Sequence, residues 1–361
     1  MFLRLGFTAF GGPAAHVALM EEEFVRRRRW VRSDEFLDLV GATQLIPGPN
    51  STEMAIHLGH RRAGAAGLVV AGAAFILPSM LLVGVLAWAY ERYGGLPQMA
   101  GILRGVKPVI VAVIAQAFWN LGRTAIKNRL LAGVGIAAGG LAFLGVDQLL
   151  LLAVAGMVPV VASMPVKRGV QGRGLVMASA LPLAGMGAPA GFGLWALFLF
   201  FLKVGSVLFG SGYVLFAFLH ADLVEGMHWL TEGQLADAIA VGQVTPGPIF
   251  TSATFIGYVL GGPAGAVVAT VGIFLPAFVF VALSGPLIPR IRASRVAGLF
   301  LDGVNAGSLA LMGVVSWHLG RAALVDATTV GLCVLAGVLL LRFRVNSAWV
   351  VVGGGVLGLL V

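Results

Sequence analysis

The chain has 361 residues, of which 59% are hydrophobic and 11% are charged, and its mean hydropathy is +0.97. Exposing so much apolar surface to water is too costly, so this composition excludes a soluble protein. The net charge of +9 does not indicate nucleic acid binding, because the basic residues lie in short loops beside apolar segments, as in membrane proteins. The single Cys333 excludes a disulfide framework and a thiol metal cluster.

Apolar segments follow one another along the whole chain, six in each half. The first lacks a charged leader and a cleavage site, so we interpret it as part of the mature fold. The last two of each half are short for a crossing helix. The segments are 2–24, 36–58, 63–90, 101–121, 130–145 and 147–165, then 193–220, 235–258, 263–284, 297–319, 327–342 and 345–361.

The two halves are copies of one unit. Gly6, Phe10, Gly11, Trp30, Asp38, Gln44 and residues 47–49 recur 199 positions later as Gly205, Phe209, Gly210, Trp229, Asp237, Gln243 and residues 246–248. After a one-residue deletion, Leu77, Pro78, Trp119 and Arg123 recur as Leu275, Pro276, Trp317 and Arg321. We therefore predict a first repeat at 1–165, a cytosolic linker at 166–192 and a second repeat at 193–361. Internal repeats with matching Gly and Pro breaks indicate a transporter whose site lies between the halves.

The basic loops predict how the chain is threaded. If the second segment of each half dips into the membrane and returns while the other five cross, basic loops at 26–32, 61–62, 123–129, 167–173, 290–295 and 342–344 are cytosolic. The outer loops then hold only Arg92 and Arg321. Five crossings are an odd number, so the second half is inverted. The prediction is an all-α polytopic membrane protein with an inverted internal repeat, about ten transmembrane helices, two re-entrant Pro-Gly-Pro hairpins and both termini outside.

The Pro-Gly-Pro breaks at 47–49 and 246–248 predict the substrate site. Irregular backbone at membrane depth is tolerated only where it lines a polar cavity or is buried in protein. Capping residues follow each break, so a half-helix is expected to begin there and to offer free N–H groups to an anion. The expected binding residues are Gln44, Pro47, Gly48, Pro49, Asn50, Ser51, Thr52, Gln243, Thr245, Pro246, Gly247, Pro248, Thr251 and Ser252.

The first segment of each half also contains helix breakers and a cation. Arg4 and Lys203 precede the breaks, and a cation at such depth needs an acid, a carbonyl or an anionic ligand unless it reaches the interface. We predict that Lys203 and the two tips form one anion site, with Arg4 contributing less. The break residues Gly11, Gly12, Gly210, Ser211 and Gly212 are assigned to the same site.

Three acids are candidates for carrying a coupled proton. Asp38 and Asp237 lie nine residues before their Pro-Gly-Pro breaks, and either proton exchange or helix capping explains them. Glu53 stands four residues before His57 on one helix face, a spacing that favours a local pair over a role in transport. We expect Asp38 or Asp237, before Glu53, to carry the proton.

With the motif Phe-Gly-Gly-Pro at 10–13, the Arg-rich stretch ending at Trp30, Gln-Leu-Ile-Pro-Gly-Pro at 44–49 and Gly-Gln-Val-Thr-Pro-Gly-Pro at 242–248, the chain resembles the chromate ion transporter family in its fused two-domain form. The resemblance covers nearly the whole chain. It implies a multi-pass protein of the bacterial inner membrane that exports chromate, or a sulfate-like dianion, at the expense of the proton gradient. The chain departs from its own repeat at Ser211, where the first half has Gly12.

Other functions are weighed against this one. An anion channel or uniporter would share the breaks but show no proton dependence, and an importer of sulfate-type oxyanions would reverse the direction. An intramembrane enzyme is disfavoured, and no metal or cofactor site is predicted, because the six His residues show no ligand spacing. The expected partners are an oxyanion substrate and the lipid bilayer, with a homodimer as a candidate assembly.

Overall fold

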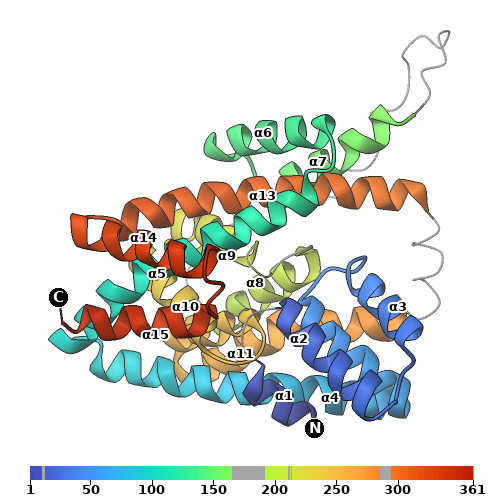
Figure 1. The fold of residues 1–361 in the computed structure, drawn as a ribbon, viewed down its shortest axis with the longest axis horizontal. Helices are drawn as coiled ribbons and strands as arrows, with labels where there is room; N and C mark the ends of the chain where they lie inside the picture. The colour runs from blue at the N-terminus through green and yellow to red at the C-terminus, as the bar shows by residue number, and fades with distance from the viewer. Residues whose placement is uncertain (10–12, 165–191, 210–211, 213, 285–293, 361) are drawn as a thin grey trace.

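In the computed structural model, every regular element of the described residues is a helix (Figure 1). The structure describes all residues except 10–12, 165–191, 210–211, 213, 285–293 and 361. The first half contains α1 (Phe2–Thr8), α2 (Pro13–Met20), η1 (Glu21–Arg27), α3 (Ser33–Thr43), α4 (Asn50–Tyr93), α5 (Pro97–Ala125), α6 (Arg129–Phe143) and α7 (Gln148–Ala162). The second contains α8 (Leu194–Val207), α9 (Leu215–Leu219), η3 (His220–Gly226), α10 (Glu232–Val244), η4 (Ile249–Thr251), α11 (Ser252–Ser284), α13 (Arg295–Ala323), α14 (Ala327–Leu341) and α15 (Ser347–Gly358).

The order of elements confirms the duplication. Both long helices that follow the Pro-Gly-Pro breaks are interrupted at matching places, α4 at Ala63 and Gly64 and α11 at Gly261 and Gly262. Within the described residues, four helices are long and apolar enough to cross a membrane, and further apolar helices are shorter. The chain is therefore an all-α polytopic membrane protein, as its composition predicts.

In the structure, the first segment of each half folds back on itself. Phe2 at the start of α1 stacks on Phe24 in η1, with ring centroids 4.9 Å apart, so α1 and α2–η1 form a hairpin that enters and leaves on one side. In the second half, Phe192 just before α8 contacts Trp229 beyond η3, at 5.4 Å. The physical reason is the break between α1 and α2, where the extended residue Ala9 ends the first helix.

The second segment is a hairpin, as predicted. Arg61, at the end of the helix that leaves the first Pro-Gly-Pro tip, is paired with Glu35, at the start of the helix that enters it. The Arg62 guanidinium also lies over the Trp30 ring at 5.4 Å. The entry and exit of this hairpin therefore share one side, and the described part of each half has two hairpins rather than one.

The hairpins of the two halves enter from opposite sides. The part of α4 beyond its kink, residues 65–93, is about 43 Å long at 1.5 Å per residue. Its first end adjoins Arg61, at the base of the first Pro-Gly-Pro hairpin, and near its other end Tyr90 donates a hydrogen bond to Asp237 of α10, at 3.0 Å. Because α10 enters the second tip, the two bases lie at opposite ends of one long helix, which is the arrangement of an inverted repeat.

The later helices of each half pack against helices of the other half. A Cβ on Gly303 of α13 would collide with the Ala155 carbonyl of α7, and one on Gly105 of α5 would collide with the Gly354 carbonyl of α15. Glycine permits these close approaches between helix backbones. The short helix α6 accompanies α13, since Lys127 before it pairs with Asp302 at 2.6 Å and Phe143 at its end contacts His318.

Because the later helices pack across the two halves, neither half packs as a separate body. The predicted repeat boundaries stay a prediction, and nearly all of the linker at 166–192 lies outside the described residues.

The sequence predicts that both termini lie outside, but the folding back of the first segment leads us to predict that they lie on opposite sides of the membrane. Phe2 lies on the side of the Arg-rich η1, whereas a Cβ on Gly101 would lie 2.7 Å from the Gly358 carbonyl oxygen, near the start of α5. In a Cys333→Ser background, we expect Arg27→Cys to react with an impermeant thiol reagent only from the cytosol and Leu359→Cys only from outside. Labelling of both from the same face would contradict this arrangement.

Candidate functional site

The two Pro-Gly-Pro tips meet the first-hairpin breaks of the opposite half. The Gly48 amide donates a hydrogen bond to the Leu208 carbonyl at 2.8 Å, and the Gly247 amide donates one to the Ala9 carbonyl at 2.9 Å. Gly48 and Gly247 are repeat equivalents, as are Ala9 and Leu208. Reciprocal contacts of this kind are the property of a two-fold axis, so the tips define a pseudo-symmetric centre.

The local backbone of each tip follows from its sequence. Gly48 has φ of 138° and Gly247 has φ of 93°, values that L-residues with a Cβ rarely adopt. Pro49 then caps α4, which begins at Asn50, and Pro248 caps η4, which begins at Ile249. The predicted helix starts are confirmed. Amides in a first turn have no partner inside the helix, so each tip directs N–H groups and partial positive charge toward the centre.

A small cavity lies between the two tips. Its volume is about 10 Å³, which is room for about one water molecule. The cavity is therefore too small for a tetrahedral oxyanion unless the tips separate. Its lining residues are His16, Pro49, Asn50, Ser51, Gly212, Pro248, Ile249 and Phe250.

Five of these lining residues are predicted ones, and three are not. His16 is 1% exposed, and its Nε2 is 3.0 Å from the Ala9 carbonyl. Its isolation in an apolar run was the only signal that could have drawn attention to it. Ile249 and Phe250 have apolar side chains, and nothing in the sequence indicated that they line the cavity.

Glu53 is buried behind the first tip. Its side chain is 0% exposed, and among the described residues neither carboxyl oxygen has a hydrogen-bond partner. A Cβ on Gly48 would collide with Oε1 of Glu53, so the carboxyl group touches the tip backbone. The expected local pair with His57 is wrong, because no hydrogen bond joins the two side chains and His57 Nε2 is also unpaired in the described part of the chain. The helix directs Glu53 against the tip rather than toward His57.

The environment of the tips is not fully symmetric. The Thr251 hydroxyl is 2.9 Å from the Ser79 hydroxyl, whereas the equivalent Thr52 hydroxyl has no partner among the described residues. Ala277 stands at the repeat position of Ser79, and its methyl group cannot replace the hydroxyl. The unpaired polar groups of Thr52 and Glu53 therefore both belong to the first half.

The two aspartates favoured as proton carriers differ in setting. Asp237 is 3% exposed, bonded to Tyr90 and 3.1 Å from the Lys107 ammonium. Asp38 is exposed on α3. Neither lines the cavity between the tips. A carboxylate held by a cation has less reason to exchange its proton than one buried without such a partner.

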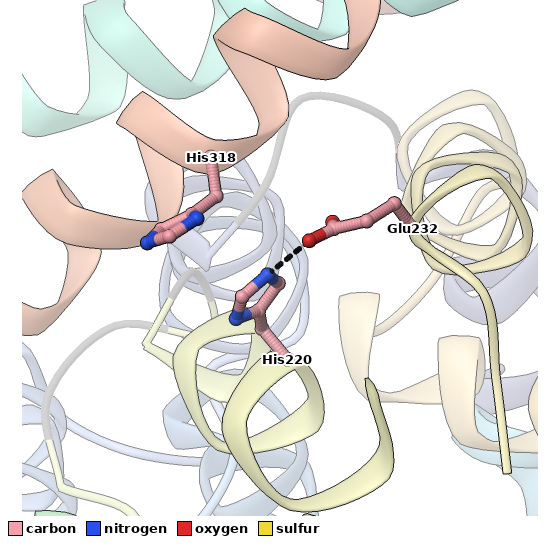
Figure 2. A group of neighbouring side chains, drawn as sticks. All are labelled: His220, Glu232 and His318. Carbon is pink, nitrogen blue, oxygen red and sulfur yellow. Dashed lines mark hydrogen bonds and ion pairs between the residues drawn. The ribbon is translucent and has the colours of Figure 1, made fainter. Parts of the chain in front are cut away.

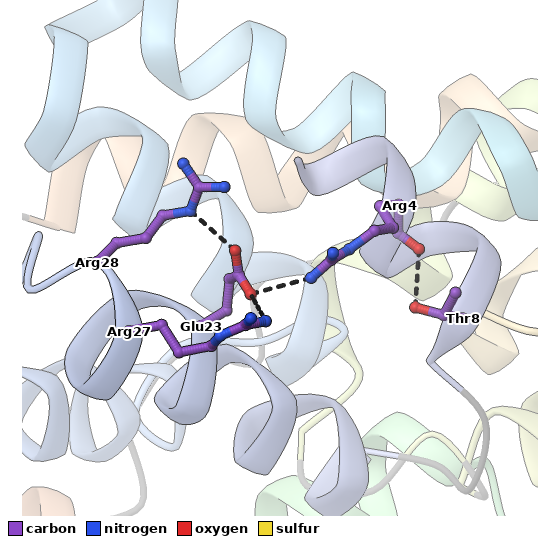
Figure 3. A network of polar contacts seen from close by, with 5 residues as sticks. All are labelled: Arg4, Thr8, Glu23, Arg27 and Arg28. Atoms are coloured by element: carbon purple, nitrogen blue, oxygen red, sulfur yellow. Dashed lines mark hydrogen bonds and ion pairs between the residues drawn. The ribbon is translucent and has the colours of Figure 1, made fainter.

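The two deep cations are paired with acids at equivalent positions. Arg4 donates to Glu23 at 2.9 Å, and Arg27 and Arg28 contact the same carboxylate (Figure 3). Lys203 pairs with Asp222, also at 2.9 Å, and the offset of 199 relates this pair to Arg4 and Glu23. Each bridge joins the two arms of a first hairpin. The structure does not bring Lys203 or Arg4 to the tip cavity, and their binding of substrate stays a prediction.

This pairing predicts a structural effect of Lys203. Asp222→Asn leaves the ammonium without its counterion, and we expect a loss of about 1–3 kcal/mol, because 37% of the Lys203 side chain stays exposed and a fully buried pair would lose more. The double variant Lys203→Met, Asp222→Leu is expected to recover most of it. Thermal unfolding of the purified protein measures both, and Arg32→Gln, in an exposed ion pair, is the control with little effect. Equal losses in the single and double variants would contradict the pairing.

The other predicted residues differ in exposure and in hydrogen bonding. Gln44 is exposed, whereas its equivalent Gln243 is 8% exposed with an unpaired Nε2 among the described residues. Thr245 donates a hydrogen bond to the Val241 carbonyl, and Ser252 donates one to the Ile249 carbonyl. Pro47 and Pro246 flank the tip glycines. The predicted residues Gly11, Gly12, Gly210 and Ser211 lie outside the described residues.

Comparison with known proteins agrees with this architecture. The sequence profile of the family described as Chromate transporter matches residues 1–160 and 195–359. The chain is 32% identical to a chromate transport protein of Cupriavidus metallidurans, over 99% of the chain and 91% of the relative. It is 33% identical to a chromate transport protein of Pseudomonas aeruginosa, over 100% and 91%, and 30% identical to a probable chromate transport protein of Synechococcus elongatus, over 91% and 85%. No solved structure matches it. The chain is a multi-pass membrane protein that belongs to the chromate transporter family.

Proposed function

We propose that this protein exports chromate, or a sulfate-like tetrahedral dianion, across the bacterial inner membrane in exchange for protons, and that the anion binds between the two Pro-Gly-Pro tips. The observation that supports this most is the reciprocal pairing of Gly48 and Gly247 around a cavity lined by both tips. The relatives from Cupriavidus metallidurans and Pseudomonas aeruginosa are chromate transport proteins, which supports chromate as the substrate.

The tips have the chemistry that a dianion requires. The first-turn amides at Asn50 and Ser51 precede the first bond of the helix, which Thr52 donates to the Pro49 carbonyl. Free amides and the positive end of a helix dipole bind anions without a cationic side chain. Two such ends, approaching from opposite sides, would hold a dianion at the centre of the molecule. The cavity is too small for a dianion in this conformation, so binding requires the hairpins to move apart.

Glu53 is the acid that we assign to the proton. A carboxylate buried without a cation is costly, and a carboxyl group avoids that cost by keeping its proton. Glu53 touches Gly48 of the first tip, so its protonation state and the occupancy of the anion site affect each other, and this linkage couples the two fluxes.

The export direction rests on the energetics of the membrane. A dianion that leaves a negative cytosol gains about 2.3 kcal/mol per charge per 100 mV. Proton coupling adds to this driving force and resets the carrier when the anion gradient is steep.

Flux of radiolabelled chromate into inside-out vesicles tests the proposal. We expect saturable uptake that a proton gradient accelerates at clamped membrane potential, and competition by sulfate. Uptake that follows the anion gradient alone would identify a channel or uniporter, and acceleration only in right-side-out vesicles would identify an importer. No flux in either orientation would remove the proposed function.

A further inference from the structure

Three side chains that could bind a metal converge at the base of the hairpin that carries the second Pro-Gly-Pro tip. His220 begins η3, Glu232 begins α10, and His318 lies near the end of α13 (Figure 2). The Nε2 of His220 is 2.7 Å from Oε1 of Glu232, and the two imidazole rings have centroids 4.8 Å apart. One ligand atom from each residue lies within 4.8 Å of the other two.

We propose that His220, Glu232 and His318 bind one divalent transition metal ion of the zinc class. Two imidazoles and one carboxylate leave a fourth position open to water, a common arrangement for Zn²⁺. Bonds of 2.0–2.1 Å in a tetrahedron place ligand atoms about 3.4 Å apart. The 2.7 Å contact is shorter than this and all three atoms lie within 4.8 Å of one another, so side-chain rotation is sufficient to bring them to the required spacing.

The surroundings of the three residues suit a metal better than a simple ion pair. The second oxygen of Glu232 is buried and has no hydrogen-bond partner among the described residues, so the existing contact leaves it unsatisfied. The Nδ1 of His220 is 3.7 Å from a Glu225 oxygen. A carboxylate behind a ligating histidine orients the ring and fixes its tautomer. The Glu232 side chain is 38% exposed, which gives an ion access to the buried imidazole of His220.

The fold itself does not require this cluster. At the equivalent positions of the first repeat stand Glu21, Ser33 and Asn120, which do not form such a ligand set. The cluster is therefore a property of the second half alone. Its three ligands come from separate elements, which explains why their sequence spacing gives no motif.

A bound ion would join α13 to the base of the hairpin that carries the second Pro-Gly-Pro tip. Glu232 begins the helix that enters the tip at Gly247, and His318 belongs to a helix that packs against both halves. The ion would thus restrain the element whose movement opens the tip cavity. This consequence rests on the proposed function, whereas the binding site itself does not.

Titration of the purified full-length protein with Zn²⁺, after removal of metal with a chelator, tests the site. We expect one saturable ion per chain by calorimetry and an increase in thermal stability that needs the metal. Each of His220→Ala, Glu232→Gln and His318→Asn is expected to weaken binding at least about tenfold. His228→Asn is the matched control, because His228 lies between η3 and α10 but outside the cluster. Asparagine also tolerates its positive φ of 53°.

Co²⁺ provides a second readout that does not depend on stability. Its visible absorption spectrum reports a four-coordinate site with nitrogen ligands, and we expect it in the wild type and in His228→Asn but not in His318→Asn. Unchanged thermal unfolding of the metal-free His318→Asn variant would show that it folds. Wild-type protein that binds no Zn²⁺, or a folded His318→Asn variant with wild-type affinity, would overturn the proposal. Neither result bears on anion flux, which tests the proposed function separately.

Discussion

Glu53→Gln is expected to remove the dependence of transport on the proton gradient while anion exchange continues. Glutamine has nearly the same shape as glutamic acid but cannot release a proton. Because Glu53 touches the Gly48 backbone and is 0% exposed, the amide should leave the tip geometry intact. The ratio of chromate uptake with and without a proton gradient should fall to roughly one.

The two aspartates provide the comparison for Glu53. Asp38→Asn changes an exposed acid on α3 and should retain the pH profile of the wild type. Asp237→Asn removes the partner of Lys107 and should lower stability more than coupling. Chromate counterflow measures exchange, and uptake driven by a pH step measures coupling. A normal pH profile in Glu53→Gln, with its loss in Asp38→Asn or Asp237→Asn, would move the proton to that aspartate.

Gly247→Ala is expected to abolish transport. The positive φ of 93° disfavours alanine by about 1–3 kcal/mol. A Cβ would also lie 2.8 Å from the Ser79 Cβ, and overpacking of this kind costs a further ~1–3 kcal/mol. The Gly247 amide would lose its alignment with the Ala9 carbonyl, and the second tip would move out of the centre.

Gly331→Ala is the matched control for this prediction. Gly331 lies inside α14 with no atom within 4 Å of the position of a Cβ, so alanine should be neutral or stabilising by up to about 1 kcal/mol. Size-exclusion chromatography of detergent extracts measures the folded fraction, and chromate uptake is divided by that fraction. Full activity per folded molecule in Gly247→Ala would show that the close approach at Ser79 is not required.

Composition and repetition predicted the membrane fold, the duplication and the broken hairpin at Pro-Gly-Pro. These features are local: apolar runs must avoid water, and a proline on each side of a glycine must interrupt a helix wherever the chain places it. The helix starts at Asn50 and near Ile249 follow from the same chemistry.

The folding back of the first segment was not predicted from the sequence. Its length allowed a span, and nothing in the sequence showed that Phe2 would stack on Phe24 across the break. The charge pattern could not separate the two possibilities, since a hairpin and a span leave the Arg-rich residues 26–29 on the same side.

Only the tertiary structure decided which polar residues meet. Arg4 and Lys203 were recognised as cations that need partners, but the choice of Glu23 and Asp222 over an anion depends on the folding back of each first hairpin. We assign the proton to Glu53 rather than to an aspartate for the same reason, because burial and pairing depend on neighbours distant in sequence. Asp237 pairs with Lys107 of the other half, whereas Glu53 lies against Gly48 and has no salt bridge to a cation among the described residues. Sequence determines which residues must avoid lipid and where helices break, while packing between the two repeats determines which charges are neutralised.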